Sequence, residues 1–499
     1  MHKVHSVKYN FIMNFILTAS GFIFPLITFP YVSRVLLETG NGKVAFVTAY
    51  VNYFLMVAQL GIPTYGIRAC ARVRDDKEKL SRTYQELMII NLVTTTIITG
   101  VYFITLFTVP QLFENRTMFI INACTFFLQF MGANWLFQAL EQYDYITIRN
   151  IIFKVISIVL MFILVRQAGD YIIYSTLIMF AAYGSNVLNF FRARKYVTLR
   201  KKGVYDFKQH IKPIMTLFAQ SLAISIYTNL DTIMLGFMKD DAQVGYYSAA
   251  TRIKVILASL VTSLGNVLLP RMSYYVKKGM KSEFSRLMVK AMNFALFISI
   301  PLGLFFFIAS SESLRVLAGG RYEPATLTLS FLALCVIPIG ITNVIGIQVL
   351  TPLEDEKQVM LSVIAGAVTD FLLNLAFIPA FGSTGAAAAT LIAEVVVLIM
   401  QLRYARNIIQ PVRHYIKLPK YVVTGICAAV PAFLIHLIPF PHPVINLIIE
   451  VVVFFGIYAG ILYAAKDKMI TETLETVNSK LKKIKQKKTP ADREGGNNR

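Results

Sequence analysis

Long apolar stretches recur along the chain from residue 9 to residue 465, and short polar segments separate them. A transmembrane α-helix needs about 20 predominantly apolar residues. The pattern therefore predicts an all-α, polytopic membrane protein with fourteen transmembrane helices. We expect these helices over residues 9–37, 43–69, 83–110, 116–139, 146–167, 170–192, 212–237, 243–270, 284–309, 323–351, 357–380, 384–405, 416–438 and 443–465.

Basic residues are distributed unequally between the two sides of the membrane that this helix pattern defines. If the N-terminus is cytoplasmic, 40 of the 49 Lys and Arg residues fall on the inner side and seven on the outer side. The other two, Arg252 and Lys254, fall inside the eighth predicted helix. Cytoplasmic segments of membrane proteins carry an excess of Lys and Arg. The distribution predicts that both termini are cytoplasmic, and it explains the net charge of +22 without a nucleic-acid partner.

The longest inner segment divides the first twelve helices into two sets of six. We expect an N-terminal six-helix lobe, a cytoplasmic linker, a C-terminal six-helix lobe forming a V with the first, a pair of additional helices and a basic cytoplasmic tail. The corresponding residues are 1–192, 193–211, 212–410, 411–466 and 467–499.

A weak internal repeat supports the division into two halves. The second helix opens with VAFVTAYVN (44–52) and the eighth with VGYYSAATR (244–252). A Leu-Gly pair follows about twenty residues later in each case, at Leu60-Gly61 and Leu264-Gly265. Parallel repeats of this kind are typical of transporters, whose substrate site lies where the halves face each other.

Composition excludes several functional classes. The chain is 56% hydrophobic and 15% charged, with a mean hydropathy of +0.60. A soluble domain has about 25% charged residues, so a soluble enzyme, a nucleic-acid binder and a disordered protein all fit poorly. The sequence contains no Walker A loop, no HExxH motif and no CxxC pair. We expect the four cysteines to be small buried hydrophobic residues. We expect no enzyme activity, no cofactor and no metal site.

Arg252 is the clearest candidate for substrate binding. It lies about nine residues from the outer end of its helix, which corresponds to roughly 13 Å of depth. Charges at that depth usually face a cavity lined by protein. The alternative is a salt bridge to an acid in a neighbouring helix, with Asp231 as the nearest candidate. Lys254 allows the same two interpretations, and Asn229 is grouped with Asp231 as a further substrate-binding candidate.

Arg34 ends the first predicted helix, in the segment PLITFPYVSR (25–34). Pro25 and Pro30 each remove a backbone donor, so we expect this helix to bend or unwind. Arg34 either serves the substrate or simply extends to the outer interface. Asp231 pairs with Arg34 or with Arg252, or else binds a coupling cation.

Three acids lie alone in apolar surroundings. Asp370 and Glu394 are the candidates for coupling to H⁺ or Na⁺, and packing as protonated or hydrogen-bonded residues is the alternative for each. Glu450 in the last helix is similar.

Several segments together resemble the Wzx-type oligosaccharide flippases, relatives of the lipid II flippase MurJ and of the MATE exporters. They are FPLITFPYVSRVL (24–36), YFLMVAQLGIPTYGIR (53–68), NWLFQALEQYDYITIRNIIFK (134–154), LDTIMLG (230–236) and VGYYSAATRI (244–253). The chain departs from the family pattern at Leu37, where a glycine is usual, so a tight turn is less expected there.

The resemblance implies a bacterial inner-membrane flippase that alternates between inward-open and outward-open states. Its partners would be the lipid bilayer and an undecaprenyl-pyrophosphate-linked oligosaccharide for O-antigen, capsule or exopolysaccharide, together with the polysaccharide polymerase machinery. The resemblance also implies a monomer, and it assigns pyrophosphate binding to Arg34 and, less securely, to Arg252.

Two alternatives remain within the same superfamily: a lipid II flippase and a MATE-like, cation-coupled multidrug exporter. An exporter of cationic drugs requires an anionic cavity, whereas the deepest charges in this sequence are basic. A membrane-embedded polymerase or glycosyltransferase is a third alternative, but such enzymes usually present a sizeable catalytic loop.

Overall fold

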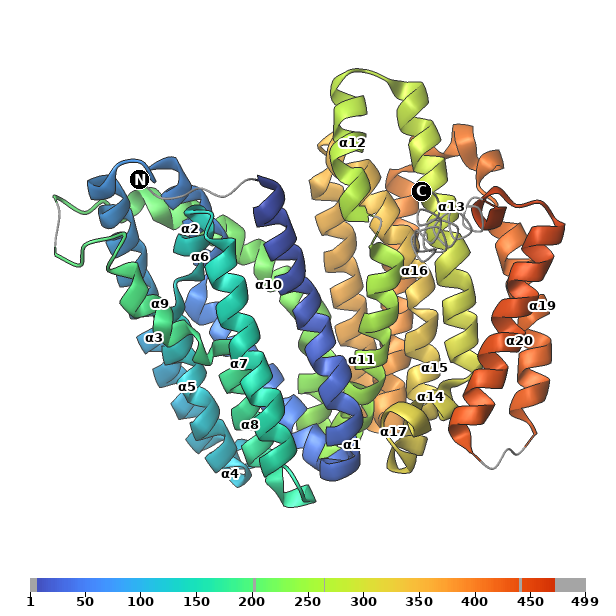
Figure 1. Ribbon diagram of the computed structural model, residues 1–499, viewed down its shortest axis with the longest axis horizontal. Coiled ribbons are helices and arrows are strands. Elements are labelled where there is room, and N and C mark those ends of the chain that lie inside the picture. Colours follow the sequence, from blue (N-terminus) through green and yellow to red (C-terminus); the bar gives the residue numbers. More distant parts are fainter. Residues whose placement is uncertain (1–6, 201–202, 264, 439–441, 472–499) are drawn as a thin grey trace, which may run out of the picture. The chain divides into compact units, whose positions relative to one another are not determined.

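A computed structural model describes residues 7–200, 203–263, 265–438 and 442–471, and within these residues every regular element is helical (Figure 1). The α-helices are α1 (Val7–Gln59), α2 (Ile62–Arg72), α3 (Lys77–Thr108), α4 (Pro110–Glu114), α5 (Arg116–Gly132), α6 (Asn134–Ala139), α7 (Tyr143–Leu164), α8 (Tyr171–Met179), α9 (Asn186–Ala193), α10 (Lys208–Met238), α11 (Asp241–Thr262), α12 (Gly265–Lys277), α13 (Lys281–Ile308), α14 (Ser310–Leu317), α15 (Thr326–Leu334), α16 (Val336–Thr342), α17 (Glu356–Tyr404), α18 (Arg406–Ile409), α19 (Leu418–His436) and α20 (Pro443–Ala464). Two π-helical segments, η2 (Phe180–Gly184) and η4 (Asn343–Leu350), and four short 3₁₀ segments complete the elements: η1 (Ala168–Asp170), η3 (Gly320–Ala325), η5 (Thr351–Leu353) and η6 (Gln410–Tyr415).

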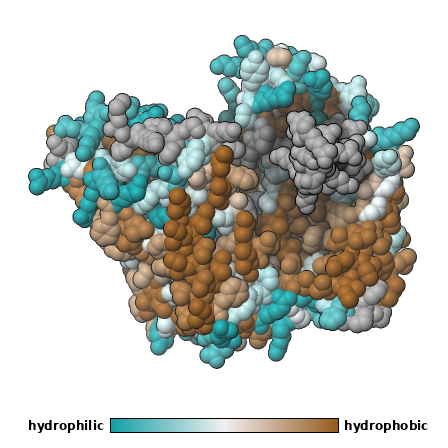
Figure 2. Space-filling view, in the orientation of Figure 1, coloured by the Kyte–Doolittle hydropathy of each residue, from teal (hydrophilic) through white to brown (hydrophobic). Residues whose placement is uncertain are grey.

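The helices have the length and surface of membrane-spanning segments. Ten helical segments among the described residues are long and apolar enough to cross a membrane. Large apolar side chains are exposed along them, for example Ile97 and Ile104 on α3 and Phe127 on α5. Figure 2 shows hydrophobic residues covering the middle of this surface, with hydrophilic residues at its ends. The protein is therefore a multi-pass membrane protein, while the count of fourteen helices remains a prediction.

Two of these segments each combine two predicted helices. The first and second predicted helices join in α1, and the eleventh and twelfth join in α17. Each long element contains one residue outside the helical region, Leu37 (φ 60°, ψ −172°) in α1 and Gly382 (φ 56°, ψ −132°) in α17. These positive-φ residues stand where the sequence analysis expects the connections between helices.

The turn at Leu37 forms although the residue is not glycine. A side chain at positive φ is strained, so the turn requires other support. The Leu37 carbonyl accepts hydrogen bonds from Tyr322 Oη at 2.9 Å and Asn41 Nδ2 at 3.0 Å. The prediction that a tight turn is less expected at Leu37 is therefore wrong, because Tyr322 and Asn41 hold the Leu37 carbonyl in place.

Local sequence also determines where helices begin and break. The helix α3 starts at Lys77, ahead of the predicted residue 83, because the Asp76 side chain accepts from the amides of Glu78 and Lys79. The first Leu-Gly pair of the repeat separates α1 from α2 at Leu60-Gly61. In the second half, α12 begins at Gly265, the glycine of the corresponding pair. The first pair thus marks a break between two helices, whereas Leu264 of the second pair lies outside the described residues.

The chain forms two compact units. The first comprises residues 1–256, 313–332 and 357–400, and the second comprises residues 257–312, 333–356 and 401–499. Trp135, Tyr84 and Leu136 belong to a hydrophobic core of the first unit. Met272, Met288 and Val349 belong to one in the second unit. The predicted division into two six-helix lobes remains a prediction.

A buried carboxylate joins the N-terminal end of α19 to the segment that follows α20. Asp467 accepts from Lys417 Nζ at 3.0 Å and Lys420 Nζ at 2.8 Å. Burial alone would raise the pKa of Asp467, but these bonds and one from the Met469 amide hold the pKa below its usual value. The rest of the predicted tail, from residue 472, lies outside the described residues.

The cysteine prediction is correct in part. All four cysteines are free, as expected from the absence of a paired spacing. Cys70 and Cys335 are buried, whereas Cys124 and Cys427 are exposed on the apolar surface. The interpretation of all four as buried residues is therefore wrong for these two, because a hydrophobic helix face in a membrane protein can equally face lipid.

Candidate functional site

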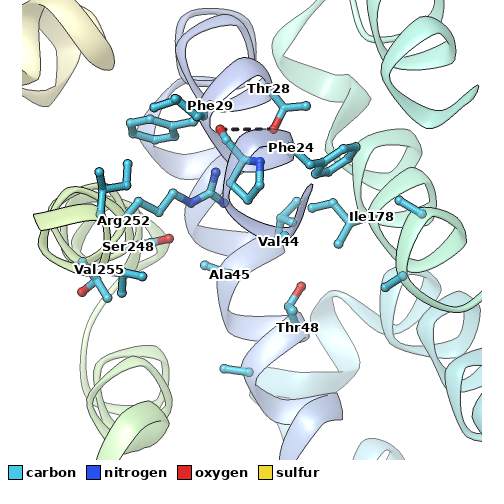
Figure 3. A pocket seen from close by; sticks show the side chains of 18 of the residues that line it. Phe24, Thr28, Phe29, Val44, Ala45, Thr48, Ile178, Ser248, Arg252 and Val255 are labelled. Atoms are coloured by element: carbon cyan, nitrogen blue, oxygen red, sulfur yellow. Dashed lines mark hydrogen bonds between the residues drawn. The ribbon is translucent and has the colours of Figure 1, made fainter. Parts of the chain in front are cut away.

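The first unit contains a cavity of about 510 Å³. Residues of α1 before and after Leu37 form one wall, and the segment of α11 from Ser248 to Ile256 forms another. Lys154 of α7, Asn229 and Thr232 of α10, Leu317 of α14 and residues of α8 and η2 complete the lining. In Figure 3, side chains from α1 and α11 point toward the same space. The cavity therefore lies between segments from both halves of the sequence repeat.

The lining is mixed in polarity. Apolar side chains such as Phe24, Val44 and Ile178 alternate with the small polar side chains of Thr48 and Ser248. η2 contributes Ala181 and Ala182, and π-helical segments often occur at functional sites. The cavity thus offers polar contacts inside an apolar helix bundle.

Arg252 places its guanidinium in this cavity. The side chain is half-buried, and its guanidinium carbon lies 5.0 Å from the centre of the Phe29 ring on α1 (Figure 3). No hydrogen bond or ion pair holds the guanidinium among the residues that the structure describes. A cation on an aromatic ring keeps its N–H donors available for a ligand. Arg252 thus lies at a protein-lined cavity, and its role in substrate binding remains a prediction.

Lys154 supplies a second cation that the sequence analysis did not single out. It lies in the middle of α7, and its Nζ donates to Ser20 Oγ at 2.9 Å. The charge distribution along the sequence places Lys154 on the inner side, whereas the structure places it eleven residues after the start of α7. The described lining residues of the cavity include Lys154 and Arg252 but no Asp or Glu. The cavity is consequently cationic.

Arg34 lies outside this lining. Its guanidinium is exposed and donates to two backbone carbonyl groups, those of Pro30 and Val316. Arg34 thereby ties the first half of α1 to α14. The expected unwinding at Pro25 and Pro30 is also absent, because α1 continues through both prolines and departs from helical geometry at Leu37.

Asp231 belongs to a separate buried cluster in the first unit. Its carboxylate accepts from Asn374 Nδ2 at 2.6 Å, from Thr390 Oγ1 at 3.0 Å and from Tyr247 Oη. The hydrogen-bond partners of Asp231 therefore include neither Arg34 nor Arg252 among the described residues, so both proposed pairings are wrong. Asp231 lies only 21 residues before Arg252 in the sequence, but the two side chains do not pair, because Asp231 faces α17.

Asp370 faces the Asp231 carboxyl at hydrogen-bonding range. Asn374 Nδ2 bridges the two, lying 3.2 Å from Asp370 Oδ2. Asp370 Oδ1 has no hydrogen-bond partner within the described part of the chain. Two buried carboxyl groups at this range repel each other when both are charged, so either one of them holds a proton or a metal cation lies close to both.

The remaining predicted residues lie near these two sites. Lys254 and the buried Glu394 are both close enough to act electrostatically on Asp370. Asn229 lines the cavity, and its Nδ2 lies 3.4 Å from the Ser225 carbonyl. The structure thus brings Arg252 and Asn229 together at the cavity, and it brings Asp231, Asp370, Glu394 and Lys254 together beside it.

Comparison with protein families gives two matches. The family described as "Polysaccharide biosynthesis protein" matches residues 7–276, which is more than half of the chain. The MatE family matches residues 217–376. The two matches overlap over α10 and α11, the helices that contribute Asn229 and Arg252 to the cavity.

Two bacterial relatives align with this chain over nearly their whole length. Both carry the name "Putative O-antigen transporter". The one from Shigella dysenteriae is 25% identical over 400 residues, covering 80% of this chain and 99% of the relative. The one from Escherichia coli K12 is 25% identical over 410 residues, covering 81% and 97%.

Solved structures of two transporter types share the fold. The lipid II flippase MurJ in an inward closed conformation superposes with a TM-score of 0.70 at 15% identity, covering 92% of this chain and 99% of that chain. An inward-facing multidrug resistance MATE transporter of the MOP superfamily gives a TM-score of 0.61 at 13% identity, covering 78% and 95%. At these identities the likeness establishes the fold alone.

Proposed function

The chain belongs to the polysaccharide biosynthesis protein family, and we propose that it is a flippase for a lipid-linked oligosaccharide. The cargo is an undecaprenyl-pyrophosphate-linked repeat unit of O-antigen, capsule or exopolysaccharide. It moves from the inner to the outer leaflet of the bacterial inner membrane by alternating access. The protein acts as a monomer with both termini in the cytoplasm. The names of its bacterial relatives support this proposal.

The observation that carries the proposal is the cationic cavity. A pyrophosphate that enters a low-dielectric membrane must exchange its hydration for charged hydrogen-bond donors. Arg252 offers a bidentate guanidinium, and Lys154 offers a compact ammonium. The small polar side chains of Thr48, Asn52 and Ser248 suit sugar hydroxyl groups. The prenyl tail can remain in the surrounding lipid.

The same observation argues against the exporter alternative. A site for cationic drugs needs carboxylates facing the ligand, and the described lining of this cavity contains none. The lipid II flippase alternative is different, because lipid II also carries a pyrophosphate and would suit the same cations. The identity of the accumulated lipid must separate these two cargoes.

Depletion of the protein in its own host tests the proposal directly. We expect a pyrophosphate-linked oligosaccharide to accumulate on the inner leaflet while surface polysaccharide is lost, as measured by leaflet-resolved lipid analysis. Accumulation of lipid II instead would reassign the cargo to peptidoglycan synthesis. An unchanged lipid pool with altered drug tolerance would refute the flippase proposal and favour an exporter.

We further propose that Asp231 and Asp370 bind the coupling cation, H⁺ or Na⁺. Their carboxyl oxygens, together with Asn374 and Thr390, form a compact set of oxygen and amide groups buried from solvent. The chain has no Walker A loop, so an ion gradient is a suitable source of energy. One elementary charge that crosses the membrane gains about 2.3 kcal/mol per 100 mV.

Asp370→Asn should change the ion dependence of transport. The substitution keeps the size of the side chain but removes the charge that a cation would neutralise. We expect uptake of lipid-linked oligosaccharide in vesicles to lose its response to an imposed H⁺ or Na⁺ gradient. Glu114→Gln, which neutralises an exposed acid on α4, is the matched control and should respond as the wild type does. An unchanged gradient response in Asp370→Asn would leave Asp370 as a packing residue.

A further inference from the structure

Three ionisable side chains of the second unit, one each from α14, α19 and α20, lie close together. Glu312 lies near the start of α14, His436 is the last residue of α19, and Glu450 lies in α20. His436 Nδ1 lies 3.0 Å from Glu312 Oε2 and 3.2 Å from Glu450 Oε1. One ligand atom from each residue falls within 4.8 Å of the other two. The three residues are far apart in the sequence, so no spacing motif revealed them.

The cluster contains too little positive charge for its two carboxylates. Glu450 is fully buried and Glu312 is 7% exposed. The Nδ1 atom of an imidazole carries one hydrogen at most, so it can satisfy only one of the two nearby carboxylate oxygens. His436 Nδ1 is hydrogen-bonded to Glu450 Oε1. Glu312 Oε2 is close to the same nitrogen but has no hydrogen bond of its own among the described residues, and neither does Glu450 Oε2. Buried carboxylates without partners are costly, which indicates that a further cation belongs here.

We propose that Glu312, His436 and Glu450 form a binding site for a divalent transition metal, with Zn²⁺ as the ion that fits best. One imidazole nitrogen and two carboxylate oxygens are typical Zn²⁺ ligands, and a water molecule can supply the fourth position. Two carboxylates and a neutral imidazole balance the charge of a divalent ion. The imidazole favours Zn²⁺ over Mg²⁺ and Ca²⁺, which prefer sites made of oxygen alone.

The geometry is close to what such an ion requires. Tetrahedral Zn²⁺ with bonds of about 2.0–2.2 Å holds its ligand atoms roughly 3.3–3.5 Å apart. The two separations from His436 Nδ1, 3.0 and 3.2 Å, differ from that by only a few tenths of an ångström. Small rotations of the glutamate side chains would complete the site.

The consequence of the metal would be mechanical. α19 and α20 pack along each other within the second unit, and Glu312 belongs to the same unit. A metal ion bound to all three residues would lock the end of α19 and the second turn of α20 to the start of α14. The site is independent of the cavity in the first unit, and the proposal does not depend on the transported cargo.

Metal analysis of the purified full chain tests the site. The protein is purified in detergent without a histidine tag, incubated with Zn²⁺, passed over a desalting column and analysed by mass spectrometry for bound metal. We expect about one Zn²⁺ per chain in the wild type and less than a fifth of that in Glu450→Gln and His436→Ala. His442→Ala removes an exposed histidine of the same loop region and serves as the control, which should retain the metal.

A spectroscopic measurement on the wild type covers the case in which the variants fail to fold. Zinc X-ray absorption should show a first shell of nitrogen and oxygen atoms with the signature of one imidazole. Wild-type protein that retains no Zn²⁺, equal Zn²⁺ retention in His436→Ala, or a shell without imidazole would each overturn the proposal. The first of these outcomes would leave His436 as a protonated partner of the two glutamates.

Discussion

Arg252→Ala is expected to abolish transport of the lipid-linked oligosaccharide while leaving the amount of protein in the membrane unchanged. Charge-assisted hydrogen bonds are each worth about 1.5–3 kcal/mol, and a bidentate contact involves two of them. Removing the guanidinium should therefore reduce transport by about a hundredfold or more. The stability of the fold should change little, because the guanidinium contacts the Phe29 ring and holds no ion pair among the described residues.

Complementation of a deletion strain, scored by surface polysaccharide and by membrane protein level, measures this effect. Arg252→Lys should restore transport only in part, because lysine keeps the charge and loses the planar, bidentate donor pair. Arg116→Ala is the matched control, since Arg116 also stacks on an aromatic ring, that of Phe113, but lies on the exposed surface. Full complementation by Arg252→Ala would contradict a role in binding pyrophosphate.

The sequence predicted the membrane class and the approximate helix positions because both depend on the length of apolar stretches. Helix boundaries depend on single hydrogen bonds, and these were harder to anticipate. The early start of α3 follows from the Asp76 cap, and the turn at Leu37 follows from Tyr322, which is distant in the sequence. A turn that a remote side chain supports leaves no local signal, particularly when its residue is not glycine.

Some residues of the candidate site could be predicted from the sequence and others could not, for a similar reason. The depth of Arg252 could be judged from its position in an apolar stretch, and the structure places it at the cavity. The partners of Asp231 could not be judged, because they depend on which face of α10 meets α17. The depth of Lys154 could not be judged in the same way, because α7 begins at Tyr143 and the apolar stretch that predicts this helix begins only at residue 146. The cluster of Glu312, His436 and Glu450 has no sequence pattern, since three separate helices form it.

The crossing of α1 and α11 carries the second large effect. Gly42 and Gly245 lie where the two helices touch, and both positions are in the first unit. A β-carbon at Gly42 would collide with the carbonyl oxygen of Asp241 and would lie 2.9 Å from the Gly245 nitrogen. A β-carbon at Gly245 would collide with the carbonyl oxygen of Glu38. The two backbones therefore touch directly, which only glycine allows.

This contact lies at the end of the cavity that the charge distribution assigns to the outer side. It keeps the α1 and α11 walls together there, so outward opening requires the glycine contact to separate. Gly245→Ala would force a separation of the two backbones, because the obstructing atom belongs to the main chain and cannot rotate away. We expect the variant to favour the outward-open state and to lower transport at least tenfold, since a transporter held in one state cannot complete its cycle.

Labelling of a cysteine in the cavity measures the shift in state. Ser248→Cys, in a background where the exposed Cys124 and Cys427 are replaced by alanine, is treated in intact cells with a maleimide that cannot cross the membrane. Gly245→Ala should increase the labelling rate severalfold. Gly100→Ala is the control, because an added β-carbon at Gly100 meets no atom within 4 Å. Labelling and transport equal to those of the Gly100→Ala control would show that the glycine crossing does not act as the outer closure, since the cavity would then open without separating these two backbones.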